Sequence, residues 1–279
     1  MKREGIMKLL IVSADPRLTL GYSKVIQQIA NYLATKEVEI VMYTLNFREN
    51  SVLPCTYIDP RIKLLPVPDS QSYGFDKFRS VVDKECPDYV FIYGPTNVIY
   101  NYISLLDNSM KVCVYLDICQ KWSELHTLQK LKNRVTHWFT FLKCWSDHLV
   151  NDLKIDSERV SVVEHGVNFS EFEPVDTKQA KDVMGFGKFL VLNMNRNSIR
   201  KNWAVTISGF VEFISRHEYN PDIQLYVSCG ANKKHSDNHC DIEAHVYTEF
   251  FKRGLEYMNY TKNFIINDHP LRLTKEKLN

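Results

Sequence analysis

The sequence predicts an α/β protein in which buried parallel strands alternate with helices that cover the sheet. Three observations lead to this fold class. Short apolar runs such as residues 9–12 recur between polar segments, which is typical of strands buried on both faces. Helical patterns lie between these runs, and the clearest one puts Trp203, Ile207 and Phe210 on one face. The regular alternation of the two patterns favours parallel strands joined by right-handed crossovers.

Up to residue 164 strands and helices alternate, except that no helix is expected between the strands at 39–44 and 61–67. The expected strands are residues 8–13, 39–44, 61–67, 89–93, 111–116, 135–142 and 160–164. The expected helices are residues 25–33, 75–84, 98–106, 122–131 and 146–153. Because parallel sheets bind ligands beyond the carboxyl ends of their strands, functional residues are expected just after these strands.

A polar, proline-containing stretch, residues 165–177, interrupts the alternation. We therefore expect an N-terminal domain at 1–165, a linker and the start of a second domain at 166–186, and a C-terminal domain at 187–279. In the C-terminal domain the expected strands are 189–194, 223–229 and 263–266, and the expected helices are 203–214, 242–256 and the first turns of one at 273–279.

Composition narrows the function classes. A chain of 279 residues suits about two domains, and its 44% hydrophobic and 24% charged residues are ordinary for a globular protein. The formal charge of +2 argues against a nucleic-acid partner. No run approaches the ~18 apolar residues that span a bilayer, and the start does not resemble a signal peptide. The seven cysteines are interpreted as buried thiols of a reducing, cytoplasmic compartment.

Three cations follow the strand at 189–194 directly. Arg196, Arg200 and Lys201 come where a helix begins, and backbone N–H groups and the helix dipole favour an anion at such a place. Arg supplies a bidentate fork and Lys a point charge, which together suit a diphosphate. The alternative is a solvated basic turn.

The turn after the first strand is the second candidate site. Gly21, Tyr22 and Ser23 open the first helix, and the glycine would let a ligand approach closely. The alternative is a plain loop. The other glycines of G-x-G-x-x-G are absent, which disfavours a dinucleotide cofactor. Asp117 ends another strand, and it is equally well interpreted as a site carboxylate or as an ordinary helix N-terminal Asp.

Metal binding is not expected. His235, His239, Cys240 and His245 cluster in a polar segment, but their spacing matches no standard zinc site and a solvated loop is favoured. The chain also contains no Asp-x-Asp pair, the carboxylates that commonly hold a metal-bound diphosphate. We expect no metal and no cofactor.

Three segments in order resemble the GT-B glycosyltransferases, specifically the large retaining family 4 group. Residues 10–33, with Gly21-Tyr-Ser-Lys, look like the start of that family. His165-Gly-Val-Asn168, followed by Phe172-Glu-Pro174, resembles its interdomain "NGVD…F.P" segment. Arg196 and Lys201 resemble its "R-x4-K" donor-phosphate motif. Residues 193–201 look most like the glycosyltransferases of large DNA viruses and some bacteria.

The resemblance implies two Rossmann-like domains of GT-B type and transfer of a sugar from a UDP- or GDP-linked donor. Arg196 and Lys201 would hold the leaving diphosphate without a metal, and Gly21 would lie near it. His165, Gly166 and Asn168 would belong to the interdomain segment. Asp117 is a weak candidate for a polar role toward a glycan, protein or lipid acceptor, because the family often has a His there. The resemblance is compatible with peripheral contact with a membrane surface. It is also compatible with a location in the host cytoplasm, if the protein is viral.

One family feature is missing. The acidic E-x7-E motif should follow a helix that begins like residues 273–279, where this chain stops, so we expect a fragment or a truncated C-terminal domain. Apolar residues in 271–278 would then favour self-association. The alternative function is a catalytically inactive relative that binds nucleotide or sugar, or a scaffold.

Overall fold

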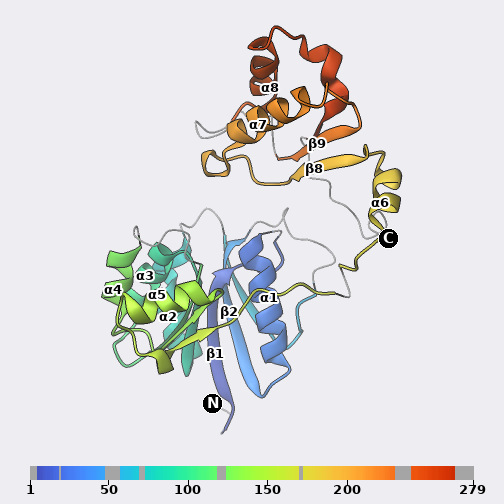
Figure 1. The fold of residues 1–279 in the computed structure, drawn as a ribbon. Coiled ribbons are helices and arrows are strands. Elements are labelled where there is room, and N and C mark those ends of the chain that lie inside the picture. The colour runs from blue at the N-terminus through green and yellow to red at the C-terminus, as the bar shows by residue number, and fades with distance from the viewer. Residues whose placement is uncertain are drawn as a thin grey trace. The chain divides into compact units, whose positions relative to one another are not determined.

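The computed structural model describes residues 5–18, 20–47, 57–68, 73–117, 124–169, 172–229 and 240–267. The chain forms two compact units, residues 1–167 and 168–279, which are described separately (Figure 1). No helix in the described ranges is long and apolar enough to cross a bilayer.

The N-terminal unit contains a seven-stranded parallel sheet with the order β3-β2-β1-β4-β5-β6-β7. Its strands are β1 (Met7–Ala14), β2 (Val38–Phe47), β3 (Lys63–Pro68), β4 (Tyr89–Gly94), β5 (Lys111–Leu116), β6 (His137–Thr140) and β7 (Val160–Val162). The chain first builds outward from β1 to β3 and then returns to the other side of β1 with β4. This reversal puts the topological switch point between β1 and β4, the usual place for a ligand in such sheets.

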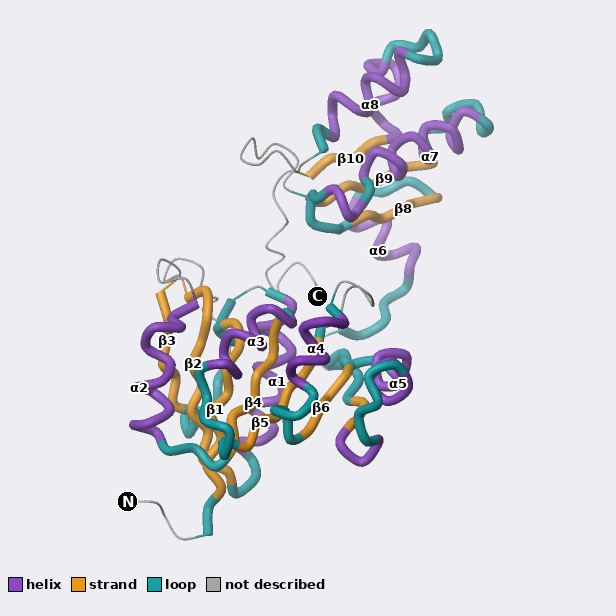
Figure 2. Tube along the Cα trace, turned by 90° about the vertical axis from the view of Figure 1, so that its left-hand side faces the viewer, coloured by secondary structure: helices purple, strands orange, loops and turns teal. Residues whose placement is uncertain are grey.

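Helices cover both faces of this sheet (Figures 1 and 2). On one face α1 (Gly21–Ala34) packs through Ile26 and Ala30 against Leu9 and Ile11 of β1. On the other face Leu10 belongs to a second hydrophobic core, which the strands form with four helices: α2 (Phe75–Glu85), α3 (Thr96–Ser104), α4 (Leu125–Leu131) and α5 (Lys143–Asn151). Strand β1 is apolar on both faces because both are covered, which explains its continuous hydrophobic run.

The C-terminal unit has a smaller parallel sheet, ordered β10-β9-β8. Its elements are α6 (Thr177–Met184), β8 (Phe189–Asn193), α7 (Trp203–Ser215), β9 (Ile223–Ser228), α8 (Ile242–Phe251) and β10 (Phe264–Asn267). Helices α7 and α8 pack together on one face, and Trp203, Ile207, Val227 and Phe250 form the centre of this core, each at most 1% exposed.

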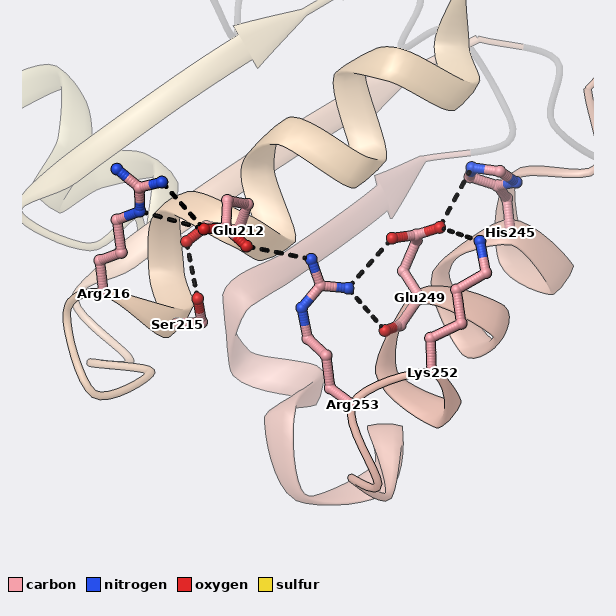
Figure 3. A network of polar contacts seen from close by, with 7 residues as sticks. All are labelled: Glu212, Ser215, Arg216, His245, Glu249, Lys252 and Arg253. Carbon is pink, nitrogen blue, oxygen red and sulfur yellow. Dashed lines mark hydrogen bonds and ion pairs between the residues drawn. The ribbon is translucent and has the colours of Figure 1, made fainter.

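A charged network fastens α7 to α8 (Figure 3). The Glu249 carboxylate, 7% exposed, accepts hydrogen bonds from Lys252 Nζ at 2.8 Å and Arg253 Nη1 at 3.1 Å. Arg253 also reaches Glu212 of α7 at 3.2 Å. The hydrogen bond from Lys252 is the largest cause that lowers the pKa of Glu249, ahead of the opposing effect of burial. The ionised carboxylate therefore stabilises the packing of the two helices.

The comparison with the sequence expectations confirms the α/β class and each expected strand up to residue 266. Two helices differ most from the expectations. Helix α8 ends at Phe251, because a left-handed turn at Gly254 leads into the 3₁₀ turn Tyr257–Asn263. Helix α6 was missed: it has only eight residues and buries none of them, although Ala180, Val183 and Met184 recur at helical spacing and Asp176 caps it. The segment 273–279 lies outside the described residues.

The expectation of buried thiols was also wrong in part. Of the five cysteines in the described ranges, only Cys229 is buried, while Cys86 and Cys144 are exposed. Cys86 ends α2 in a left-handed conformation, and Cys144 lies in the exposed first turn of α5. None of the five forms a disulfide.

Candidate functional site

The turn between β8 and α7 carries the three cations at the carboxyl edge of the second sheet. Arg196 and Arg200 are exposed and Lys201 is half-buried. Within 172–229 and 240–267, no carboxylate lies at ion-pair distance from any of them. Their charges are therefore not neutralised by the described protein groups around them.

The backbone under these side chains is anchored at several points. Asn195 donates through its side-chain amide to Asn193 Oδ1 at 2.8 Å. The indole of Trp203 donates to the Arg196 carbonyl at 3.3 Å. Asn197 is 3% exposed, and its amide pairs with both the N–H and the carbonyl of Cys240. The turn thus combines a fixed main chain with free cationic ends.

The sequence placed Lys201 in the opening of the helix, and the structure corrects this in detail. Ile199–Lys201 form a 3₁₀ turn, and Asn202 then adopts a left-handed conformation with φ of 50° before α7 starts at Trp203. No side chain caps α7, and its first turn contains no acidic residue. The N–H groups of that turn and the three cations share one edge, a combination that suits an anion such as phosphate.

At the carboxyl edge of the first sheet, the cation Arg17 already forms an ion pair with Asp15. Asp15, completely buried, accepts from Arg17 Nε at 2.8 Å and Nη2 at 2.7 Å, and from the Thr44 hydroxyl at 2.7 Å. The Arg17 guanidinium also lies 4.7 Å from the ring centre of Phe47. This hydrogen-bonded cluster holds the loop after β1 against β2 and leaves little of Arg17 for a ligand.

Gly21, Tyr22 and Ser23 begin α1 at the switch point, as the sequence order requires. A Cβ on Gly21 would meet no described atom within 4 Å, so there is open space at this helix start. The Tyr22 ring lies 4.9 Å from that of Tyr93, at the end of β4. Ser23 is fully buried, and its hydroxyl, like that of Ser13 on β1, has no hydrogen-bond partner among the described residues.

Asp117 follows β5 and is half-buried at the same edge. Burial raises the pKa of Tyr115 to about 12, and the negative charge of Asp117 adds to this shift. The same two causes, in the same order, raise the pKa of Tyr93. Asp117 therefore lies close to two neutral phenols whose rings stack at 4.8 Å.

The segment after β7 begins against this aromatic group. The Tyr115 hydroxyl donates to the Val163 carbonyl at 2.5 Å, and His165 stacks on Phe141 with ring centres 5.0 Å apart. A Cβ on Gly166 would likewise meet no described atom within 4 Å, and the Asn168 carbonyl accepts from the amide of Phe172 at 3.0 Å.

The structure thus gathers Gly21, Tyr22, Ser23, Asp117 and His165 at one sheet edge, and Arg196 and Lys201 at the edge of the other sheet. Gly166 and Asn168 lie in the segment that follows. The roles assigned to all of these residues stay predictions. The anchors Asn197 and Trp203 were not identified from the sequence, because their partners are backbone groups that no spacing reveals.

The histidine and cysteine cluster is only partly described, since His235 and His239 lie outside the described residues. Cys240 is held through its backbone by Asn197, and the His245 ring contacts the Ser208 hydroxyl at 3.3 Å. In the described parts of the chain, no three His, Cys, Asp or Glu side chains are grouped so as to hold a metal ion.

Comparison with known proteins adds a fold. No protein-family model and no curated protein matches the sequence. Among solved structures, a glycosyltransferase from Rickettsia africae ESF-5 matches with a TM-score of 0.61 and 13% identity, over 98% of this chain and 70% of that one. A sucrose-phosphate synthase from Thermosynechococcus elongatus matches with a TM-score of 0.64 and 11% identity, over 98% and 72%.

The UDP complex of S. aureus MnaA matches equally well, with a TM-score of 0.61 and 15% identity over 98% of this chain and 71% of that one. A UDP-GlcNAc 2-epimerase from Methanocaldococcus jannaschii matches with a TM-score of 0.56 and 13% identity, over 98% and 76%. At such low identity these likenesses show the fold alone. Together with the parallel sheets described above, they show that the chain has the GT-B fold with Rossmann-like domains.

Proposed function

We propose that the protein is a retaining, metal-independent glycosyltransferase that uses a UDP- or GDP-linked sugar. The observation that carries the proposal is the cationic turn after β8: Arg196, Arg200 and Lys201 project from an anchored backbone without a described carboxylate partner. Free charges on a fixed turn are suited to binding a diphosphate rather than to stabilising the fold.

In sugar transfer the bond between the anomeric carbon and the diphosphate oxygen breaks, and negative charge develops on the leaving diphosphate. The Arg196 guanidinium would bind two of its oxygens, and the Lys201 ammonium would add a point charge. Such cations stabilise the transition state most when they are already in place before charge develops. The uncapped start of α7 would add backbone donors to the same anion.

The test is the binding of UDP and GDP to the 279-residue chain and to the double variant Arg196→Ala, Lys201→Ala. Charge-assisted hydrogen bonds are worth about 1.5–3 kcal/mol each, so affinity should fall at least about tenfold. Lys188→Ala is the matched control, because Lys188 lies at the opposite end of β8 and pairs with Asp222 at 2.9 Å. Equal affinity of the double variant and the native protein in calorimetry would refute the proposal.

A second candidate is a UDP-sugar 2-epimerase, and the likeness to the UDP-GlcNAc 2-epimerase from M. jannaschii favours it. A third is a binding protein without catalysis. The three are separated by incubating the chain with UDP-GlcNAc and other nucleotide sugars. A transferase releases UDP in proportion to an added acceptor, an epimerase changes the C2 stereochemistry without needing an acceptor, and a binding protein does neither.

A further inference from the structure

We propose that Asn197 is a positioning residue for the nucleotide site: its buried amide holds the main chain from which Arg196 and Lys201 reach the diphosphate. This inference rests on the proposed function, because it assigns a role toward the same anion. Asn197 would not touch the ligand itself.

The geometry of the contact carries the argument. Asn197 Nδ2 donates to the Cys240 carbonyl at 2.8 Å, and the Cys240 N–H donates to Asn197 Oδ1 at 3.0 Å. Both hydrogen bonds join one side-chain amide to one residue of the main chain. A two-point contact of this kind fixes orientation as well as distance, as neighbouring strands do in a ladder.

The contact also has the reach that the other anchors lack. Asn195 and Trp203 bind within or next to the turn, at sequence separations of 2 and 7, whereas Asn197 and Cys240 are 43 residues apart. Among the described hydrogen bonds of the turn, the pair with Cys240 is therefore the one that ties the turn to a distant element.

That element is the start of α8. Cys240 directly precedes Asp241, which caps α8 by accepting from the amide of Ala244 at 3.0 Å. Helix α8 is in turn fastened to α7 by the network of Glu249, Arg253 and Glu212 (Figure 3). The turn is thus attached to the packed pair of helices α7 and α8. This pair of helices fixes the position of the main chain that carries Arg196 and Lys201.

Positioning matters because long cationic side chains lose rotamer freedom when they bind. A fixed main chain limits the additional ordering that the ligand must impose, and this raises affinity without any new contact. Removal of the amide would delete both hydrogen bonds to Cys240 and release the turn from α8, while Arg196 and Lys201 themselves remain.

A matched control separates positioning from simple destabilisation. Asn263 is also buried, at 1% exposure, and its amide donates to two main-chain carbonyls, those of Asn220 and Ile223, both at 2.8 Å. It lies in the same unit but at the amino ends of β9 and β10, away from the turn. Asn197→Ala and Asn263→Ala should therefore lower the melting temperature to a similar degree.

The experiment measures the affinity of UDP and of inorganic pyrophosphate for the full chain. Asn197→Ala should weaken both by about tenfold, roughly the loss of one charge-assisted hydrogen bond. Asn263→Ala should leave both within about twofold, since distant sites act independently. In the Arg196→Ala background the effect of Asn197→Ala should shrink below about threefold, because residues that act as one unit are not additive.

Equal losses in the two asparagine variants, or no loss in Asn197→Ala, would overturn the proposal. If the double variant Arg196→Ala, Lys201→Ala still binds UDP normally, the proposed function fails; a loss in Asn197→Ala would then arise by another route, and the positioning role fails with it. If Asn197→Ala does not fold, hydrogen exchange of the native protein decides. Saturating UDP should slow exchange of the Cys240 amide, and an unchanged rate overturns the proposal.

Discussion

The first strand-to-helix turn of each unit uses arginine in the opposite way. After β1, Arg17 is bound by the buried Asp15 carboxylate and stacks on Phe47. After β8, Arg196 is exposed and no described carboxylate pairs with it. Both arginines follow a parallel strand, so position at the carboxyl edge does not by itself mark a ligand site. What distinguishes the two turns is whether the charge is already satisfied within the protein.

The largest expected effect breaks this comparison at Arg17. Arg17→Ala leaves the completely buried Asp15 carboxylate with the Thr44 hydroxyl as its remaining side-chain donor. Removing one partner of a buried ion pair costs about 3–5 kcal/mol, so the free energy of unfolding in urea should fall by that amount.

The matched variant Arg196→Ala should keep the free energy of unfolding within about 0.5 kcal/mol, as surface changes usually do. The order of the two variants should reverse for UDP affinity, which only Arg196→Ala lowers. If Arg17→Ala is as stable as the native protein, Arg17 is not committed to the fold and the contrast between the turns is wrong.

The next effect concerns the pair of helices α7 and α8 in the second unit and depends on pH. The pKa of Glu249 is lowered in the folded state, so its contribution is complete above the unfolded value of 4.5 and is lost as pH falls through the folded value. Glu249→Gln should cost about 1–2 kcal/mol at pH 7, a modest sum because Lys252 is 59% exposed and solvent screens the pair.

The difference in unfolding free energy between the native protein and Glu249→Gln should therefore disappear in acid. Urea titrations at pH 7, 5 and 3.5 measure it. A difference that stays constant over this range would show that packing, and not the carboxylate charge, holds α7 to α8.

The smallest expected effect sharpens the role of the cations. If protein side chains alone hold the diphosphate, EDTA should change the affinity for UDP by less than about twofold, whereas raising the salt concentration should weaken it, because exposed charges are screened. Calorimetry with and without EDTA, and at two salt concentrations, checks both. A strong loss on chelation would indicate that a divalent metal bridges the phosphates.

Much of the fold could be predicted because buried strands have few alternatives. The apolar run of β1 and the apolar face of α7 each predict their secondary structure from a short stretch of sequence, and the structure contains both elements. Helix α6 was missed although Ala180, Val183 and Met184 recur at helical spacing, because three such residues on a helix that buries none are a weak signal. The end of α8 was also missed, because apolar residues continue past Phe251 into a turn that packs on the same core.

The candidate site was predictable to a lesser extent. The sequence shows that Arg196 and Lys201 follow a strand. Whether their charges are free to bind a ligand depends on which carboxylates lie nearby in the folded protein. Asn197 pairs with Cys240, 43 residues away, through the main-chain atoms of Cys240. Because every residue type has these atoms, the residue at position 240 could not predict the contact. Asp117 was expected as a site carboxylate or as an ordinary helix N-terminal Asp. Tyr115 is close to it in the sequence, but its proximity to Tyr93 emerges only from the pairing of β4 with β5.

Because the backbone at Asn202 is left-handed, we expect positions 201 and 202 to tolerate different substitutions, position 202 for folding and position 201 for ligand binding. With φ of 50° and ψ of 52°, position 202 favours Asn, Asp or Gly, and β-branched residues are strongly disfavoured there. In a saturation library screened only for folded protein, position 202 would be restricted while position 201 accepted most residues. Screening the same library for nucleotide binding would restrict position 201 to Lys and Arg, and this boundary between neighbours would mark where the scaffold ends and the binding surface begins.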